Sequence, residues 1–193
     1  MSAPASYGMP PPGIIPALSI RAPWTIALAH LGKRIENRLA WRACKYRGPL
    51  ILHAAAWPSG DAARFEKKPS RSMLECYETA LEMTEMTTKS GYKGFDGRLT
   101  MREILALRGG AFAFSSIVDV VDGPIDFDMK VKAGKIPEAQ RAWYMGGFAL
   151  VLGAVKLFGA PGLPALIVPC AGALGLFGLH KDAYDLVMAW RAT

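Results

Sequence analysis

The stretch ALSIRAPWTIALAHLGKRIENRLAWRACKYRGPLILHA, residues 17–54, decides the fold class of this 193-residue chain. The short apolar run Ala17–Ile20 predicts a first strand. Pro23 then begins a helix whose apolar residues recur at helical spacing until Gly32, a residue typical of helix ends. Lys33–Arg38 is expected to form the next strand. The continuous apolar run Leu50–Ala54 predicts a third strand that is buried on both faces.

The rest of the chain adds more short strands and one long helix. Ala111–Val121 is rich in β-branched and aromatic residues and is the strongest strand prediction. Short strands are also expected at Gly147–Leu152, Ala154–Phe158 and Ala165–Val168, whereas residues 124–141 are predicted to be a charged loop. An amphipathic helix, Lys181–Arg191, would bury Tyr184, Val187, Met188 and Trp190. Many short strands with turn signals and a few helices favour a barrel-like α+β fold.

The domain organisation follows from length and composition. A chain of 193 residues forms one domain, here residues 17–193, and the Pro-rich residues 1–16 are expected to be a flexible leader. Residues 57–108 lack the strand-like apolar runs of the neighbouring segments and contain two capping boxes. These predict helices at about 72–88 and 101–107. We therefore expect a helical insertion in a β scaffold.

Composition excludes several classes of protein. With 51% hydrophobic and 20% charged residues, the chain can bury a core, which excludes wholesale disorder. Three widely separated cysteines without a C-x-x-C pair argue against a zinc ribbon or a disulfide framework and indicate a cytoplasmic protein. Residues 157–180 lack charged side chains, but three prolines argue against a membrane span. His30 and His180 have no metal-ligand companion at usable spacing, so neither a metal nor a cofactor is expected.

The positive charge of the chain is concentrated in one segment. Residues 21–47 hold seven of the 23 Lys and Arg residues but only one of the 16 acidic residues, Glu36, so they carry +6 of the formal net charge of +7. Trp24, Trp41 and Tyr46 are interleaved with these cations. Aromatic faces for stacking, beside cations for phosphate, are typical of proteins that bind single-stranded nucleic acid or splayed bases.

Four pieces of the sequence, in this order, resemble the ASCH domain (activating signal cointegrator homology), a branch of the PUA-like superfamily. Within the second piece, Lys33, Glu36 and Arg38 keep the spacing of the family's G-x-K-x-x-E-x-R pattern, although Gly32 comes one position late. Trp143–Phe148 is similar to the aromatic-glycine strand entry of bacterial and phage members. The four pieces are Ala17–Trp24, Gly32–Arg38, Tyr46–Ala54 and Pro169–Phe177.

The resemblance implies a PUA-like β-barrel with flanking helices and a cleft lined by Lys33–Arg38. The ASCH family is associated with RNA-related binding, and some members are hydrolases that act on RNA or on modified nucleosides. The resemblance covers roughly residues 17–56 and 109–178, so it implies nothing about the insertion.

Lys33, Glu36 and Arg38 are the leading candidates for a site. Side chains alternate along a strand, so Glu36 and Arg38 share one face, which Arg34 would join, and Lys33 can turn toward them. A carboxylate among cations suits a phosphate or the edge of a base; the alternative is a structural ion-pair network. Candidate ligand-binding residues are Ser19, Arg21, Trp24, Lys33, Glu36, Arg38, Trp41, Tyr46 and Arg47.

Several of these candidates have a plain structural alternative. Trp24 has the spacing of a core residue, which leaves Trp41 as the better stacking candidate. His53 lies within a buried strand and is expected to be a core histidine rather than a general base. Ser19 lacks a histidine or aspartate partner at any fixed spacing, which argues against a nucleophile.

Three functions stay open from the sequence. The first is a module that binds RNA, single-stranded nucleic acid or a modified nucleoside. The second is a metal-independent ribonuclease in which Lys33 stabilises negative charge while Glu36 or Tyr46 handles protons. An acylated-nucleoside amidohydrolase is disfavoured, because Glu36 stands where that ASCH subgroup has a threonine. The third is a protein-interaction scaffold that uses the insertion and the last helix.

Overall fold

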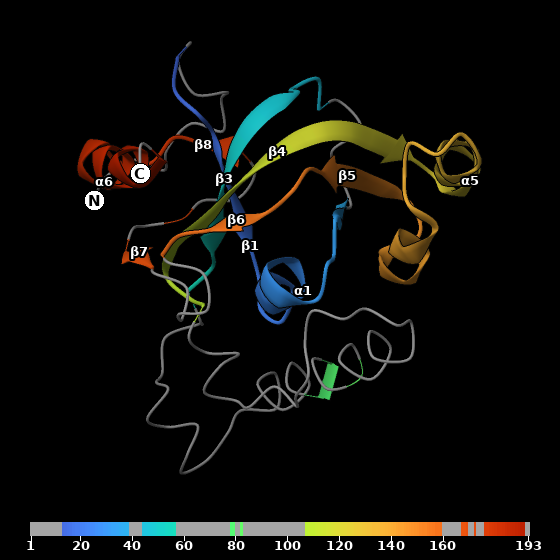
Figure 1. Cartoon of the computed structure of the whole chain (residues 1–193), viewed down its shortest axis with the longest axis horizontal. Coiled ribbons are helices and arrows are strands. Elements are labelled where there is room, and N and C mark those ends of the chain that lie inside the picture. Colours follow the sequence, from blue (N-terminus) through green and yellow to red (C-terminus); the bar gives the residue numbers. More distant parts are fainter. Residues whose placement is uncertain are drawn as a thin grey trace, which may run out of the picture.

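The computed structural model of the chain describes residues 13–38, 44–56, 78–79, 82, 107–159, 167–169, 172 and 176–191, without the side chains of the last two. In these residues it is an α+β structure whose mixed sheet curls into a half-barrel (Figure 1). Its elements in chain order are β1 (Ala17–Ile20), α1 (Trp24–His30), β2 (Ile35–Arg38), β3 (Gly48–Ala54), β4 (Gly110–Asp122), α5 (Pro124–Lys132), the 3₁₀ helix η1 (Glu138–Trp143), β5 (Phe148–Leu152), β6 (Lys156–Leu157), β7 (Val168–Pro169), β8 (Leu176–Phe177) and α6 (Lys181–Arg191).

The sheet has the strand order β2-β5-β4-β3-β1-β8, and β6 and β7 pair with β4. β1 and β3 run parallel, and the other described pairs are antiparallel. In the described part, β2 and β8 are therefore the two ends of this path. The site discussed below lies where β2 approaches β1.

β4 is the longest described strand and joins the two halves of the sheet. Its 13 residues pair with β3 along one part and with β5 along another. The register shifts between Leu52 and His53 of β3 and again between Ile117 and Asp119 of β4. Such irregularities bend a strand and increase its twist, which accounts for the curl of the sheet.

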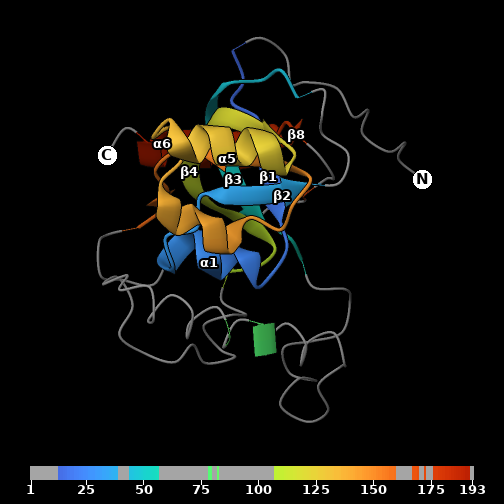
Figure 2. The same ribbon diagram turned by 90° about the vertical axis from the view of Figure 1, so that its right-hand side faces the viewer.

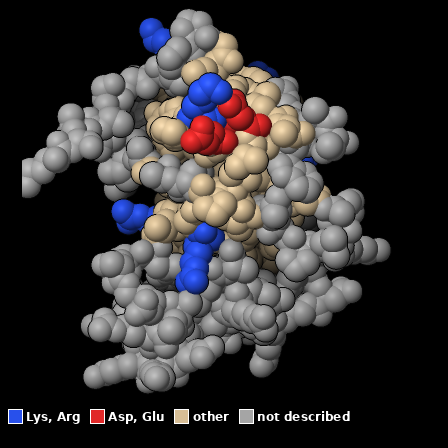
Figure 3. All heavy atoms as spheres, turned by 90° about the vertical axis from the view of Figure 1, so that its left-hand side faces the viewer, with Lys and Arg blue, Asp and Glu red and all other residues tan. Residues whose placement is uncertain are grey.

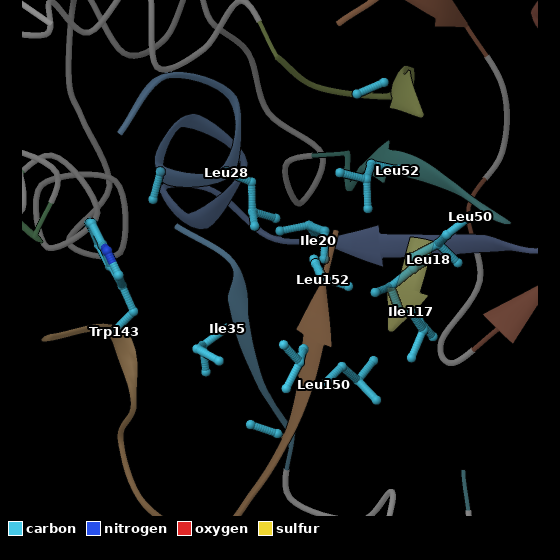
Figure 4. Packing of buried hydrophobic residues seen from close by; sticks show 14 of the residues in the cluster. Leu18, Ile20, Leu28, Ile35, Leu50, Leu52, Ile117, Trp143, Leu150 and Leu152 are labelled. Carbon is cyan, nitrogen blue, oxygen red and sulfur yellow. The ribbon is translucent and has the colours of Figure 1, made fainter. Parts of the chain in front are cut away.

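The main core fills the inside of the half-barrel. Side chains from α1 and from β1 to β5 point toward one another, as Figure 4 shows for Leu18, Leu28, Ile35, Leu50 and Leu150. α1 covers this side of the sheet, while α5 and η1 lie at one end of the molecule (Figure 2). The sheet therefore holds β1, β2 and α1 in a fixed arrangement.

A second, smaller core lies on the other face of β1 and β3. Ala17 and Ile51 contribute to it, together with Phe177 of β8. α6 adds its buried side chains Ala183 and Val187, and Tyr184 and Met188 pack against them half-buried. The amphipathic helix predicted over Lys181–Arg191 is confirmed with these bounds; the side chain of Trp190 is outside the described residues.

Most sequence predictions within the described residues agree with the structure. The strands at 17–20, 50–54, 111–121 and 147–152 and the helix after Pro23 are confirmed, with β3 and β4 longer by one or two residues at their ends. Ala154–Phe158 shortens to the two residues of β6. Of the predicted strand Ala165–Val168, only Ile167 and Val168 are described, and Val168 is strand, as part of β7. The leader as far as residue 12 and most of residues 57–106 lie outside the described residues, although residues 78, 79 and 82 are helical.

Two predictions are wrong. Residues 124–141 are not a loop: they contain α5 and most of η1. The helix α5 buries only Phe127, so its apolar residues do not follow the helical period that would have revealed it. The second strand begins at Ile35 rather than Lys33, because Gln140 holds the backbone of Gly32 and Arg34 in the turn before it.

In the described part of the chain, no helix is both long and apolar enough to cross a membrane.

Candidate functional site

The end of α1 aims Lys33 into the protein. Gly32 has a φ of 71°, in the left-handed region that glycine adopts without strain, and reverses the chain after the helix. The backbone N–H of Lys33 then donates to the carbonyl of Ala27 at 3.1 Å. Gln140, in η1, holds the same turn from the other side: its side chain accepts from the N–H of Arg34 at 2.6 Å and donates to the carbonyl of Gly32 at 2.9 Å. The turn that carries Lys33 is thus held on both sides.

Lys33, Glu36 and Arg38 form one connected cluster, which we call the charged cluster. Lys33 Nζ lies 2.9 Å from Glu36 Oε2 and also donates to the carbonyl of Ile35. Arg38 Nη2 lies 3.2 Å from the other carboxylate oxygen, Glu36 Oε1. One carboxylate is therefore held between two cations, each on its own oxygen.

The three side chains of the charged cluster differ in their access to solvent. The exposed fraction is 1% for Lys33, 9% for Glu36 and 19% for Arg38. Burial lowers the pKa of Lys33 from its usual 10.5, and the charge and hydrogen bond of Glu36 oppose this shift. The indole ring of Trp24, whose centroid is 5.3 Å from Lys33 Nζ, gives further stabilisation to the ammonium form. A molecule arriving from solvent would meet Arg38 and Glu36, with Lys33 behind them.

Arg38 also links β2 to β1. Its Nη2 donates to the backbone carbonyl of Ser19 at 2.7 Å, across the space between two strands that are not neighbours in the strand order. Ser19 in turn lies next to His53: the Ser19 hydroxyl oxygen is 3.1 Å from His53 Nδ1. The structure thus links the charged cluster, through the backbone of Ser19, to a pair of polar side chains on β1 and β3.

The other predicted binding residues lie in different surroundings. Trp24 is half-buried and packs against the main core, so its ring serves both the core and Lys33. Arg21 is exposed at the end of β1. Trp41, the predicted stacking residue, lies outside the described residues.

Tyr46 and Arg47 make their described contacts elsewhere. The hydroxyl of Tyr46 donates to the carbonyl of Pro49 at 2.5 Å, and burial raises the pKa of this phenol. Arg47 donates to the carbonyls of Cys44 and Tyr46, and its guanidinium lies 3.9 Å from Asp119 on β4. The proton-handling role predicted for Tyr46 stays a prediction, and a phenol committed to a backbone carbonyl does not favour it.

Arg34 was expected on the face of Glu36 and Arg38, and this expectation is wrong. Arg34 precedes β2, so strand alternation does not apply to it. Its Nη1 donates to the carbonyls of Leu28 and Lys33, at 3.3 and 2.7 Å. Arg34 thus stabilises the carbonyl end of α1, where a cation is favourable.

Three residues that support this region were not predicted from the sequence as parts of the site. Gln140 fixes the turn before β2. Asn37 donates from Nδ2 to the carbonyl of Trp143 at 2.9 Å and accepts from the N–H of Met145 at 3.0 Å, which fastens β2 to the end of η1 and the chain after it. His53 is the partner of Ser19. Each contact joins residues more than 30 positions apart, and no local pattern signals such a pair.

Away from the charged cluster, the surface carries mixed charges. On the face where α6 lies, blue and red side chains are gathered side by side (Figure 3). Lys181 pairs with Asp185 there at 2.5 Å, and His180 lies 3.7 Å from Asp182. The described residues of this face therefore carry charges of both signs, whereas a polyanion would favour uniform positive charge.

Comparison with known proteins adds no family assignment: no family model matches the chain, and no curated protein gives a significant match. Among the described residues, no three His, Cys, Asp or Glu side chains are grouped so that they could hold a metal ion.

Proposed function

We propose that this chain is an ASCH-type, PUA-like module that binds RNA or a modified nucleoside at the charged cluster. The curled sheet with its flanking helices supports the PUA-like assignment. The observation that carries the proposal is the position of Glu36, whose two carboxylate oxygens contact the cations of Lys33 and Arg38. The same three residues carry the resemblance to the ASCH pattern.

The chemistry of the charged cluster favours the edge of a base over a bare phosphate. Arg38 supplies N–H donors and Glu36 supplies an acceptor, and these are the two partly accessible members. The edge of a base offers both an acceptor and an exocyclic amine, which such a pair can recognise together. A phosphate offers acceptors only and would be repelled by the carboxylate. Lys33 would act from behind by holding one carboxylate oxygen of Glu36 at 2.9 Å.

The test is a binding titration with short single-stranded RNAs and a panel of nucleosides, comparing the wild type with Arg38→Ala and Glu36→Gln. We expect both substitutions to weaken binding by roughly tenfold or more, as expected for loss of one good base contact. Lys181→Ala removes the same unit of charge from α6 and serves as the matched control, with unchanged affinity expected. Thermal unfolding of each variant shows whether it is folded at the temperature of the titration.

The two variants separate the possible outcomes. If the charged cluster binds only phosphate, Glu36→Gln will tighten binding, and Arg38→Ala will reduce the dependence of log K on log salt by about one unit of slope. If no oligonucleotide or nucleoside binds the wild type, the charged cluster is a structural ion-pair network and the proposal is wrong.

A further inference from the structure

The structure places the hydroxyl of Ser19 beside the ring of His53, and neither side chain is part of the charged cluster proposed to bind RNA or a nucleoside. Ser19 and His53 are register partners on the parallel strands β1 and β3. The distance between Ser19 Oγ and His53 Nδ1 is 3.1 Å, within the range in which a histidine can remove a hydroxyl proton. We propose that Ser19 is a nucleophile activated by His53, and that the chain hydrolyses carboxylic esters.

The histidine is held in one orientation from several sides. It is 1% exposed, and the ring of Phe177 meets it edge-on, with centroids 5.6 Å apart and planes at 84°. Gly172 lies against the same ring so closely that a Cβ at that position would overlap its atoms. A base held in place by packing loses little freedom when it accepts a proton, which favours general base catalysis.

The backbone is irregular at this point. Between β3 and β4 the register shifts at His53: Leu52 pairs with Ala113, but His53 pairs with Ala111. A bulge of this kind turns the neighbouring side chains, and bulges are frequent next to active sites.

Ser19 combines partial accessibility with a fixed backbone. It is half-buried, whereas Leu18 and Ile20 on either side are fully buried. Its carbonyl accepts the 2.7 Å hydrogen bond from Arg38. The residue that carries the nucleophile is therefore joined to the charged cluster through its backbone carbonyl.

The reaction balances with water as the only co-reactant. The Ser19 oxygen attacks the carbonyl carbon of the ester and forms a C–O bond, while the hydroxyl proton moves to His53 Nδ1. The bond from that carbon to the leaving alkoxy oxygen breaks, and the alcohol leaves with the proton from His53. Water then attacks the acyl carbon and gives a proton to His53. The bond from that carbon to the Ser19 oxygen breaks, His53 returns the proton to this oxygen, and the carboxylic acid is released.

The test uses the full-length chain and a fluorophosphonate probe, which forms a covalent adduct with activated serines. We expect one adduct, located on Ser19 by peptide mass spectrometry, and none on Ser19→Ala. His53→Gln should slow labelling by roughly 100-fold, since a general base contributes about 10²–10⁴ in rate. Ser115→Ala, which removes another half-buried strand serine, is the control and should be labelled like the wild type.

A second measurement covers the case in which His53→Gln does not fold. Hydrolysis of p-nitrophenyl acetate should show a burst in the wild type and in Ser115→Ala but not in Ser19→Ala, which loses only one hydroxyl. The proposal is overturned if Ser19 carries no adduct, if folded His53→Gln is labelled as fast as the wild type, or if Ser19→Ala keeps the burst. Loss of RNA or nucleoside binding would leave all these outcomes unchanged, so the two proposals fail independently.

Discussion

At the scale of single residues, Lys33 is the most unusual feature of the protein. An ammonium group that is 1% exposed is costly unless it has a partner, and here the ammonium contacts Glu36, the carbonyl of Ile35 and the ring of Trp24. Burial nevertheless dominates, because the pKa of Lys33 is lowered in spite of Glu36. The folded protein therefore binds the proton of Lys33 more weakly than the unfolded chain does.

This difference predicts a pH dependence of stability. Between the lowered pKa of Lys33 in the folded state and the ordinary value of 10.5, the unfolded state binds more protons, so the free energy of unfolding rises with pH. The contribution is lost as the pH falls through the folded pKa, and its slope is at most about 1.4 kcal/mol per pH unit. Urea unfolding of the wild type and of Lys33→Met from pH 7 to 10.5 isolates the contribution of Lys33. All other titratable groups are present in both proteins, so their effects cancel in the difference.

Lys33→Met should lack this part of the slope, so the difference between the two curves should grow with pH in favour of the wild type. Parallel curves would show that Lys33 has the same proton affinity in both states. Glu36→Gln provides a second comparison: it leaves the buried ammonium without its carboxylate and should destabilise the protein by about 3 kcal/mol at neutral pH.

At the scale of elements, the close approach of β7 to β4 depends on a glycine. A Cβ on Gly110 would overlap the carbonyl of Val168 and the side chain of Ile167. Because the obstacle is backbone of the paired strand, it can yield only if the strands separate. Gly110→Ala should therefore lower the free energy of unfolding by about 1–3 kcal/mol, the usual range for overpacking, in urea unfolding.

Gly153→Ala is the matched control for this substitution. Its nearest obstacle is the hydroxyl oxygen of Ser116, at the end of a side chain that can rotate. We expect a loss well below that of Gly110→Ala. Equal losses would mean that the general cost of replacing a glycine, and not the contact with β7, determines the effect.

At the scale of the whole molecule, Arg38 connects β2, at one end of the described sheet, with β1, which lies next to the strand at the other end. Within the described strands, β2 is paired with β5 and β1 with β3 and β8, and the Arg38 side chain supplies a hydrogen bond between β2 and β1. Without this hydrogen bond, β2 should separate from β1 more often, although the hydrogen bonds of Asn37 to Trp143 and Met145 remain.

Hydrogen exchange tests this role. Arg38→Ala should speed the exchange of β2 amides by about tenfold, since a hydrogen bond to a charged group contributes about 1.5–3 kcal/mol. Arg38→Lys should give an intermediate result, because one ammonium cannot match the geometry of the guanidinium toward both Glu36 and the Ser19 carbonyl. Unchanged exchange in Arg38→Ala would show that the sheet is held without this contact, and Lys181→Ala should leave β2 exchange as in the wild type.

Much of the fold was predictable from the sequence because its signals are local. The apolar runs of β1, β3 and β4, the proline and glycine that bound α1, and the amphipathic pattern of α6 depend on residues a few positions apart. The contact between Lys33 and Glu36 belongs to this group, since three positions separate them. By contrast, α5 was missed because a helix that buries one side chain has no apolar stripe to detect.

By itself, the sequence determined most of the described strands, the helices α1 and α6, and the concentration of charge in residues 21–47, because periodicity, turn residues and composition act over short distances. The tertiary structure decided that Arg38 reaches the Ser19 carbonyl, that Gln140 fixes the turn of Lys33, and that His53 lies beside Ser19. The physical reason is that the pairing of β1 with β3, and the curl that brings β2 toward β1, depend on long-range contacts in the sheet and its core. Such contacts leave no pattern at any fixed spacing along the chain.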